Sequence, residues 1–580
     1  MVLLGMALLV GAATRLIPLK QMRRDYDFDP VDTQSDAEAI KQLRIPTEAL
    51  FTLRSLAINY FWIRADALKM EGQYFDANHL ARAICALQPN LPTVWDFQAW
   101  NMAYNISIAM PNPPERWTWI EDGIKLLRDQ GLKALPRSPK LYHSLGYIFG
   151  DKIGRNIDEF HRYYKQRLAF EMMDILGPGI VAQERLRQMA STPDAWEEVS
   201  ADPNIVELTA RLIAAEPLFD NDQDLLKGWI NVSVSPTDYA PEMHQLMEDY
   251  RDQYTWKQLD LFARTNQLRS AWKLDPAVML EINDRYGPVD ENDPERRIPL
   301  DWRLPYCHAI YWAEQGLQYT TDTGQTWLDL KRLLYHSLQN MFHQGKIQIL
   351  NPNRPDISTS GGGDALEEYP DKHERLEVEV YNGQDPRMFP VAFQAMMEVI
   401  DERAAVGDKA PVGVESASVY LARSLVVNIY LAGHDKLARS AYEQLKERSP
   451  DLPDYQMSLE EFVAGKIREE FESLTPRTAG QYIYAILENA FLNYAVRDDD
   501  FSTVNENLAR QIHQHMEEKS VGEKIDRRLL PEYSEMLIMA IKNVLENPTV
   551  APNVKQLLLG RIQKERPEQF AELKKVLDIR

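Results

Sequence analysis

Residues 131–146 read GLKALPRSPKLYHSLG and contain two prolines three positions apart, Pro136 and Pro139. Apolar residues follow a helical pattern before the first proline and again after the second. Because proline lacks a backbone amide donor, the pair closes one helix and marks the start of another. The same arrangement occurs at 89–92 (PNLP) and 450–453 (PDLP). Such a recurring helix–turn–helix unit is typical of helical-repeat proteins, which present binding surfaces.

The helices that follow the first two proline pairs share a spacing of large and small side chains. At matching positions they have Trp95, Gln98, Ala99 and Met102, and Tyr142, Leu145, Gly146 and Phe149. These offsets lie on one helix face. The small residue, Ala99 or Gly146, lets a partner helix approach closely.

The helices before the first and third pairs also correspond. Counting back from the first proline, the apolar positions are Phe61, Ala65, Leu68 and Ala77 in one case, and Ala422, Leu425, Val426, Ile429, Ala438 and Tyr442 in the other. Over Phe61–Ile153 and Ala422–Pro450 the chain resembles the tetratricopeptide repeat (TPR) family. The resemblance implies antiparallel helix pairs that stack, and a peptide or protein bound on a concave helical face. It carries over no catalytic residue.

The expected fold is all-α, an α-solenoid of TPR-like antiparallel helix pairs. Its segments are predicted as a transmembrane or signal-anchor helix at 1–19, a linker at 20–45, an N-terminal TPR-like array at 46–176, an irregular helical region at 177–345, a loop with a small β-hairpin at 346–390, and a C-terminal array at 391–580 with a TPR-like unit at 415–455.

The N-terminus predicts the membrane anchor. Val2–Leu19 reads VLLGMALLVGAATRLIPL, and a helix of this length nearly spans a hydrocarbon core. A cleaved secretory signal is the alternative, because Gly11–Ala13 offers small residues. The side of the membrane on which the remaining chain lies stays open.

Two short segments depart from the helical pattern. Lys346–Leu350 and Leu376–Tyr381 alternate apolar and polar residues, as half-buried strands do. They flank Gly361–Gly363, which is followed by Asp364 and Ala365 and therefore does not fit a phosphate-binding P-loop. The segment predicts a β-hairpin at 346–381, or a surface loop.

The composition and the motif search argue against several functions. The net charge of −22 disfavours nucleic acid as a partner. Cys85 and Cys307 are the two cysteines, and their pairing is left open. The two histidines of His513-Gln-His515 point away from each other on a helix and cannot easily share a metal ion. Asp498–Asp500 is read as a cap of the helix that follows. We therefore expect no catalytic residues, no cofactor and no metal.

Aromatic residues are the candidate binding surface. The candidates are Trp95, Trp100, Tyr104, Trp117, Trp119, Tyr142 and Trp302, the last in the turn-like string Asp301-Trp-Arg-Leu-Pro305. Tryptophan and tyrosine are enriched in binding hot spots, yet the same residues also fill helix-packing cores. Both interpretations remain open from the sequence.

The sequence thus favours a membrane-anchored, TPR-like scaffold that mediates protein–protein interaction or complex assembly without catalysis. An enzyme or small-ligand receptor with a pocket near Tyr286–Tyr381 is the main alternative. A structural factor that acts through self-association is a third.

Overall fold

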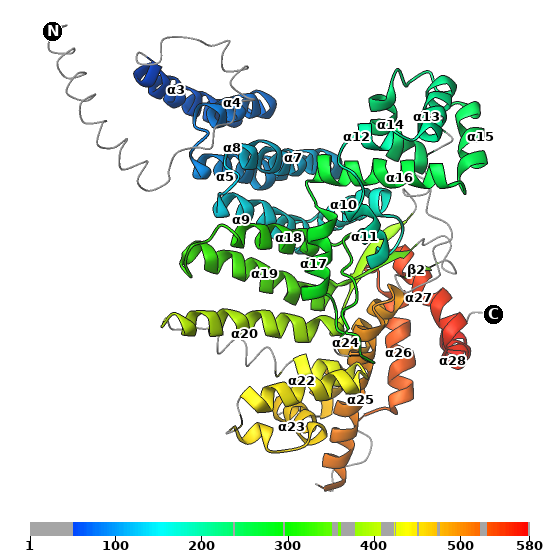
Figure 1. Ribbon diagram of the computed structural model, residues 1–580. Helices are drawn as coiled ribbons and strands as arrows, with labels where there is room; N and C mark the ends of the chain where they lie inside the picture. Colours follow the sequence, from blue (N-terminus) through cyan, green and yellow to red (C-terminus); the bar gives the residue numbers. More distant parts are fainter. Residues whose placement is uncertain are drawn as a thin grey trace, which may run out of the picture. The chain divides into compact units, whose positions relative to one another are not determined.

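The computed structural model describes residues 50–235, 238–293, 296–350, 358–360, 378–407, 423, 425–448, 450, 452–472, 476–522 and 530–577. By their internal contacts they form two compact units, Met1–Leu145 and Gly146–Arg580, which we call the N-terminal and C-terminal units. The described residues are predominantly helical and include one small β-sheet (Figure 1). The predicted all-α class is confirmed at this level.

The N-terminal unit consists of consecutive helices joined by short turns. They are α3 (Leu50–Met70), α4 (Tyr74–Leu87), α5 (Pro92–Trp100), the π-helical segment η1 (Asn101–Ile106), α6 (Ser107–Ala109), α7 (Pro113–Lys125), the π-helical segment η2 (Leu126–Gly131), α8 (Leu132–Ala134) and the start of α9 (Pro139–Tyr147). Helix α3 packs on α4, and α7 packs on η1. A Cβ atom on Gly123 of α7 would lie 2.9 Å from the Ala99 carbonyl oxygen, so these helices are in close contact.

The proline pairs act as the sequence predicts. Helices end at Leu87, Ala134 and Arg448, just before the first proline of each pair. The second proline is the first residue of α5, of α9 and of the short 3-10 helix η8 (Pro453–Tyr455).

The three proline pairs also share a hydrogen bond that was not predicted from the sequence. In each copy, the side chain six residues after the first proline donates to the carbonyl oxygen of that proline. Trp95 bonds Pro89 at 3.0 Å, Tyr142 bonds Pro136 at 3.0 Å, and Gln456 bonds Pro450 at 2.5 Å. This bond joins the chain after the turn to the first proline of the pair, in the first turn of α5 and α9 and directly after η8 in the third copy.

The C-terminal unit contains most of the helices. After the π-helical segment η3 (Ile148–Ile153) they are α10 (His161–Leu176), α11 (Gln183–Ala190), α12 (Trp196–Val199), α13 (Pro203–Ala215), α14 (Asp222–Val234), α15 (Pro241–Tyr250), α16 (Tyr254–Gln267), η5 (Leu268–Trp272), α17 (Pro276–Tyr286), α18 (Pro305–Leu317), α19 (Gln325–Gln344), η7 (Pro386–Met388), α20 (Phe389–Ala405), α22 (Asp435–Arg448), α23 (Leu459–Phe471), α24 (Pro476–Ala495), α25 (Asp499–Gly522), α26 (Tyr533–Glu546), α27 (Pro552–Glu565) and α28 (Pro567–Leu577).

Several helices of this unit pack against the next helix in the chain. Helices α18, α19 and α20 run side by side, and α24 lies between α25 and α26 (Figure 1). Gly146 is in close contact with α18 and α19. A Cβ atom at Gly146 would lie 2.9 Å from Leu333 Cδ2 and 3.1 Å from the Ala309 carbonyl oxygen. Helices α13 to α16 enclose a separate apolar cluster around Trp229 and Trp256, whose rings are 4.7 Å apart.

The strand prediction is confirmed in part. Strand β1 (Lys346–Leu350) has the predicted bounds, and it pairs antiparallel with both β2 (Ser358–Ser360) and β3 (Glu379–Gly383), in the order β2-β1-β3. Strand β3 lies a few residues later than predicted, and β2 was not predicted. The glycine run at 361–363 is outside the described residues.

The predicted single-pass membrane anchor is wrong for the part of the chain that the structure describes. None of these helices is both long and apolar enough to cross a bilayer. The physical reason is charge: α3, for example, has 21 residues but includes Arg54, Arg64, Asp66 and Lys69. The segment 1–19, which carried the prediction, and the linker 20–45 lie outside the described residues. Membrane localisation and a membrane partner are therefore not part of the function proposed below.

Candidate functional site

The N-terminal unit exposes aromatic rings on two neighbouring helices. Phe97 and Trp100 are 46% and 44% exposed, and Trp62 and Tyr104 are half-buried. The rings form two pairs, Trp62 with Phe97 at 5.3 Å and Trp100 stacked on Tyr104 at 5.9 Å. We call these four residues the aromatic surface. Phe97, Trp100 and Tyr104 follow a helical spacing of three and four, which places them on one face of α5 and η1.

Polar groups border the aromatic surface. The Lys69 ammonium donates to Asn101 Oδ1 at 2.9 Å, which joins α3 to η1, and Asn105 Nδ2 donates to the same oxygen at 3.0 Å. This network holds the two helices in register. It also places an amide and an ammonium beside the exposed rings, where they could bind polar backbone groups of a partner.

The other predicted aromatic residues are in the cores. Trp95, Trp117, Trp119 and Tyr142 are buried in the N-terminal unit, and Trp95 and Tyr142 bond the proline turns. Trp302 belongs to the C-terminal unit, where it is 1% exposed and its indole donates to Asn283 Oδ1 at 3.1 Å. Of the seven candidates, Trp100 and Tyr104 are the ones that a partner could touch directly.

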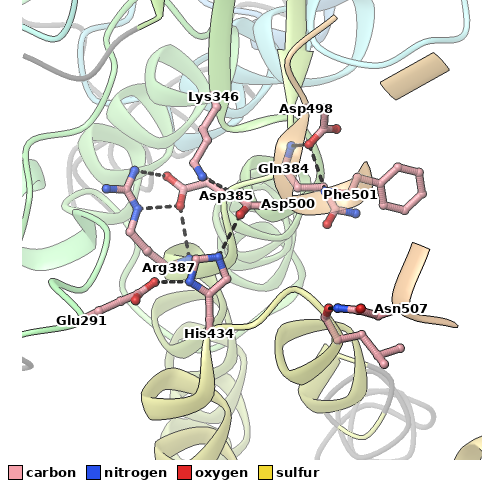
Figure 2. Close-up of polar contacts among 11 residues, drawn as sticks. Glu291, Lys346, Gln384, Asp385, Arg387, His434, Asp498, Asp500, Phe501 and Asn507 are labelled. Atoms are coloured by element: carbon pink, nitrogen blue, oxygen red, sulfur yellow. Dashed lines mark hydrogen bonds and ion pairs between the residues drawn. The ribbon is translucent and has the colours of Figure 1, made fainter. Parts of the chain in front are cut away.

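A charged cavity lies beside the sheet in the C-terminal unit. Its volume is about 460 Å³, and its lining includes Glu291, Lys346, Gln348, Asp385, Arg387 and His434. Its charged side chains contact one another (Figure 2). Arg387 binds Asp385 through Nε and Nη2, both at 2.8 Å, and Lys346 pairs with Asp500. His434 contacts Glu291 and Asp500.

These contacts shift the ionisation of two groups. The hydrogen bond to Asp500 raises the pKa of His434 above its ordinary 6.5, against the effect of burial. Burial alone would raise the pKa of Asp500, but the hydrogen bond from His434 and the charge of Lys346 bring it below its ordinary 3.8. Both groups are therefore held in their charged forms.

Sequence reasoning did not find this cluster. Its members come from the loop around Glu291, from β1, η7 and the start of α22, and from the start of α25. No spacing along the chain connects them. The one sequence signal nearby was Asp498–Asp500, and its capping role is confirmed for Asp498, whose carboxylate accepts the Phe501 amide at 3.3 Å and the Gln384 amide at 3.1 Å.

Asp498 gives a pH-dependent prediction. Burial raises the pKa of its carboxyl from the ordinary 3.8 to about 6, although its two backbone bonds act the other way. A raised carboxyl pKa means that ionisation destabilises the fold as the pH rises from 3.8 through about 6. Asp498→Asn keeps an acceptor oxygen without the charge, so relative to the wild type it should gain about 1–3 kcal/mol between pH 4 and pH 7. Thermal melts over this range measure the gain.

The comparison variant is Asp498→Ala, which removes the acceptor of both amides. It should be less stable than Asp498→Asn at every pH, by about 1 kcal/mol or more. An Asp498→Asn protein that loses stability relative to the wild type as the pH rises would contradict the prediction.

The two cysteines lie in apolar surroundings. Cys85 and Cys307 are free and buried. Burial raises the pKa of the Cys85 thiol to about 12 and also raises that of Cys307, so neither is a ready nucleophile. Among the described residues, no group of three or more histidine, cysteine or carboxylate side chains is arranged to hold a metal ion.

Comparison with protein-family models, with characterised proteins and with solved structures finds no match for this chain. Its function is therefore argued from its own residues.

Proposed function

We propose that this protein is a non-catalytic binding module of TPR-like helix pairs, a scaffold that binds a peptide or protein partner on the aromatic surface. The observation that carries the proposal is that exposed Phe97 and Trp100 pair with half-buried Trp62 and Tyr104, across α3, α5 and η1. Large exposed aromatic residues that lie together are typical of protein-binding sites.

The shared turn design supports the repeat aspect of the proposal. Three proline turns separated by up to 361 positions, from Pro89 to Pro450, use the same side-chain bond to the first proline. A repeated helix pair is expected to repeat such local contacts. The solenoid arrangement itself remains part of this proposal.

The partner would present apolar side chains to the rings and backbone groups to Asn101, Asn105 and Lys69. Because the chain carries a net charge of −22, a neutral or basic segment would approach it more readily than an acidic one.

The charged cavity gives less support to the alternative of an enzyme or a small-ligand receptor. It overlaps the predicted region near 286–381. However, Arg387, Lys346 and His434 each contact a carboxylate of the chain itself. A substrate would have to displace these ion pairs. The aromatic surface requires no such displacement.

Peptide selection tests the proposal. A phage-displayed library of random peptides is selected on the full-length chain, and the affinity of the enriched peptides is measured by fluorescence anisotropy. We expect enriched peptides that are rich in apolar residues. Trp100→Ala should weaken their binding about 30-fold, because loss of a hot-spot side chain costs about 2 kcal/mol.

The matched control is Tyr254→Ala, which removes an aromatic ring 72% exposed at the start of α16, in the C-terminal unit. It should leave the affinity unchanged, and both variants should melt as the wild type does. Failure to enrich any peptide, or equal affinity of the Trp100→Ala protein, would overturn the proposal.

A further inference from the structure

His434 contacts two carboxylates that come from distant parts of the C-terminal unit. It lies directly before α22, with Nδ1 2.5 Å from Glu291 and Nε2 2.9 Å from Asp500 Oδ1 (Figure 2). An ionised carboxylate accepts hydrogen bonds and donates none. Both ring nitrogens must therefore carry a hydrogen, which is the case only for the positively charged imidazolium.

The two carboxylates differ in what else holds them. Asp500 also pairs with Lys346 at the start of β1. For Glu291, the described residues provide one ion pair, that with His434, and a weaker attraction to the charge of Arg387. When the imidazolium gives up one proton, the Nε2 hydrogen is the better retained, because the hydrogen bond to Asp500 acts on the ring more strongly than the charge of Glu291 does. The Nδ1 lone pair would then face the Glu291 carboxylate and repel it.

We propose that His434 is a proton-dependent staple: while charged it ties the loop around Glu291 to the start of α25, and release of the Nδ1 proton to solvent frees that loop.

Other charged groups face this staple from every element around it. They are Asp290 on the loop, Lys346 on β1, Asp385 and Arg387 at η7, Asp498 on the segment before α25, and Lys436 on α22, while Asp435 follows His434 directly in the chain. Asp385 and Arg387 neutralise each other through two hydrogen bonds at 2.8 Å. Lys436 adds a weak bond to Asn292 Oδ1 at 3.4 Å, so it holds the loop less firmly than His434 does.

The loop that the staple holds separates two hollows. Asp290, Glu291 and Asn292 line both the cavity of about 460 Å³ and a neighbouring groove of about 1090 Å³ along α20 and α22. When Glu291 is released, residues 290–292, which line both spaces, can move. The two spaces then become accessible to each other, so protonation of one histidine controls access to the cavity beside the sheet.

The direction of the pH effect follows from the pKa of His434, which lies above its ordinary 6.5 in the folded protein. A histidine with a raised pKa stabilises the fold fully below its ordinary value, and the contribution is lost as the pH rises through the folded value. The staple is therefore closed below pH 6.5 and opens as the pH rises above that value through the folded pKa of His434.

Hydrogen exchange of the full-length protein tests the staple. The reporters are the amides of Val289 and Asp290, which donate to the carbonyl oxygens of Arg387 and Arg296, each at 3.2 Å. After correction for intrinsic exchange, their protection in the wild type should fall at least about tenfold along a pH series that starts at about pH 6 and rises through the folded pKa of His434. In His434→Gln, protection should be low throughout the series, because glutamine carries no positive charge to hold both carboxylates in place.

Two further variants complete the test. His244→Gln removes a half-exposed histidine of α15 and should keep the pH step. Glu291→Gln removes the carboxylate that Nδ1 binds while leaving the histidine, and it should abolish the step even if His434→Gln proves unstable. A wild type without the step, or a step that persists in both His434→Gln and Glu291→Gln, would overturn the proposal. Peptide binding on the aromatic surface is independent of either result.

Discussion

Replacing Gly146 by tryptophan should destabilise the C-terminal unit by about 3 kcal/mol or more. Even a single Cβ atom at this position would lie 2.9 Å from Leu333 Cδ2, 3.1 Å from the Ala309 carbonyl oxygen and 3.3 Å from Trp312 Cβ. The leucine methyl can move, but the carbonyl belongs to the backbone of α18 and cannot. An indole therefore has no space unless the helices separate.

Gly146→Ala separates the two effects that act at this position. Alanine favours a helix over glycine by about 1 kcal/mol, whereas the contact with α18 opposes it. We expect the contact to win and the alanine variant to lose stability, by less than the tryptophan variant. Thermal unfolding followed by circular dichroism gives the order of the three proteins.

The matched control is Gly465 on α23, where a Cβ atom would meet nothing within 4 Å. Gly465→Ala should stabilise its helix by about 0.5–1 kcal/mol, because helix propensity acts there without a steric penalty. A Gly146→Trp protein that melts with the wild type would show that the helix face predicted from the sequence is wrong.

Gly146 and the proline pairs were within reach of sequence reasoning because their signals are local. A proline inside a helical pattern ends the helix, and a small residue, Ala99 or Gly146, at the matching position of two helices indicates close packing. The bonds from Trp95 and Tyr142 to the turns were not predicted, since an indole or phenol six residues from a carbonyl has many other orientations available.

The aromatic surface could be predicted only in part. Trp95 and Trp100 are five residues apart, about 140° around a helix, so one is buried while the other is exposed. A prediction based on residue type alone does not distinguish the buried tryptophan from the exposed one. Phe97, which a strict helical-face argument places with Trp100, was not among the predicted surface residues.

The charged cluster could not be predicted. His434 lies 143 positions from Glu291 and 66 from Asp500, by their numbers in the chain. Only the folding of the C-terminal unit brings them together. A chain with 87 acidic residues offers too many carboxylates for any pair to be selected in advance.

Removing the carboxylate of Asp301 should have the second large effect, a loss of about 3–5 kcal/mol in the C-terminal unit. Arg303 is 1% exposed, and its Nε and Nη2 donate to the two Asp301 oxygens at 2.8 and 2.6 Å. Its Nη1 is buried without a hydrogen-bond partner among the described residues, so the aspartate alone compensates the charge. In Asp301→Ala, a buried guanidinium would be left without its counter-charge.

The double variant Asp301→Leu, Arg303→Met distinguishes this charge effect from a loss of packing. It removes both charges and keeps apolar volume, so it should be clearly more stable than Asp301→Ala, because no buried charge is left unpaired. The exposed pair Glu572–Lys575 gives the control: its atoms are also 2.6 Å apart, yet its side chains are 59% and 70% exposed, and Glu572→Ala should cost less than about 1 kcal/mol. Thermal and urea unfolding of the four proteins measure the differences. If Asp301→Ala were no less stable than the double variant, the unpaired charge of Arg303 would not be the cause of the lost stability.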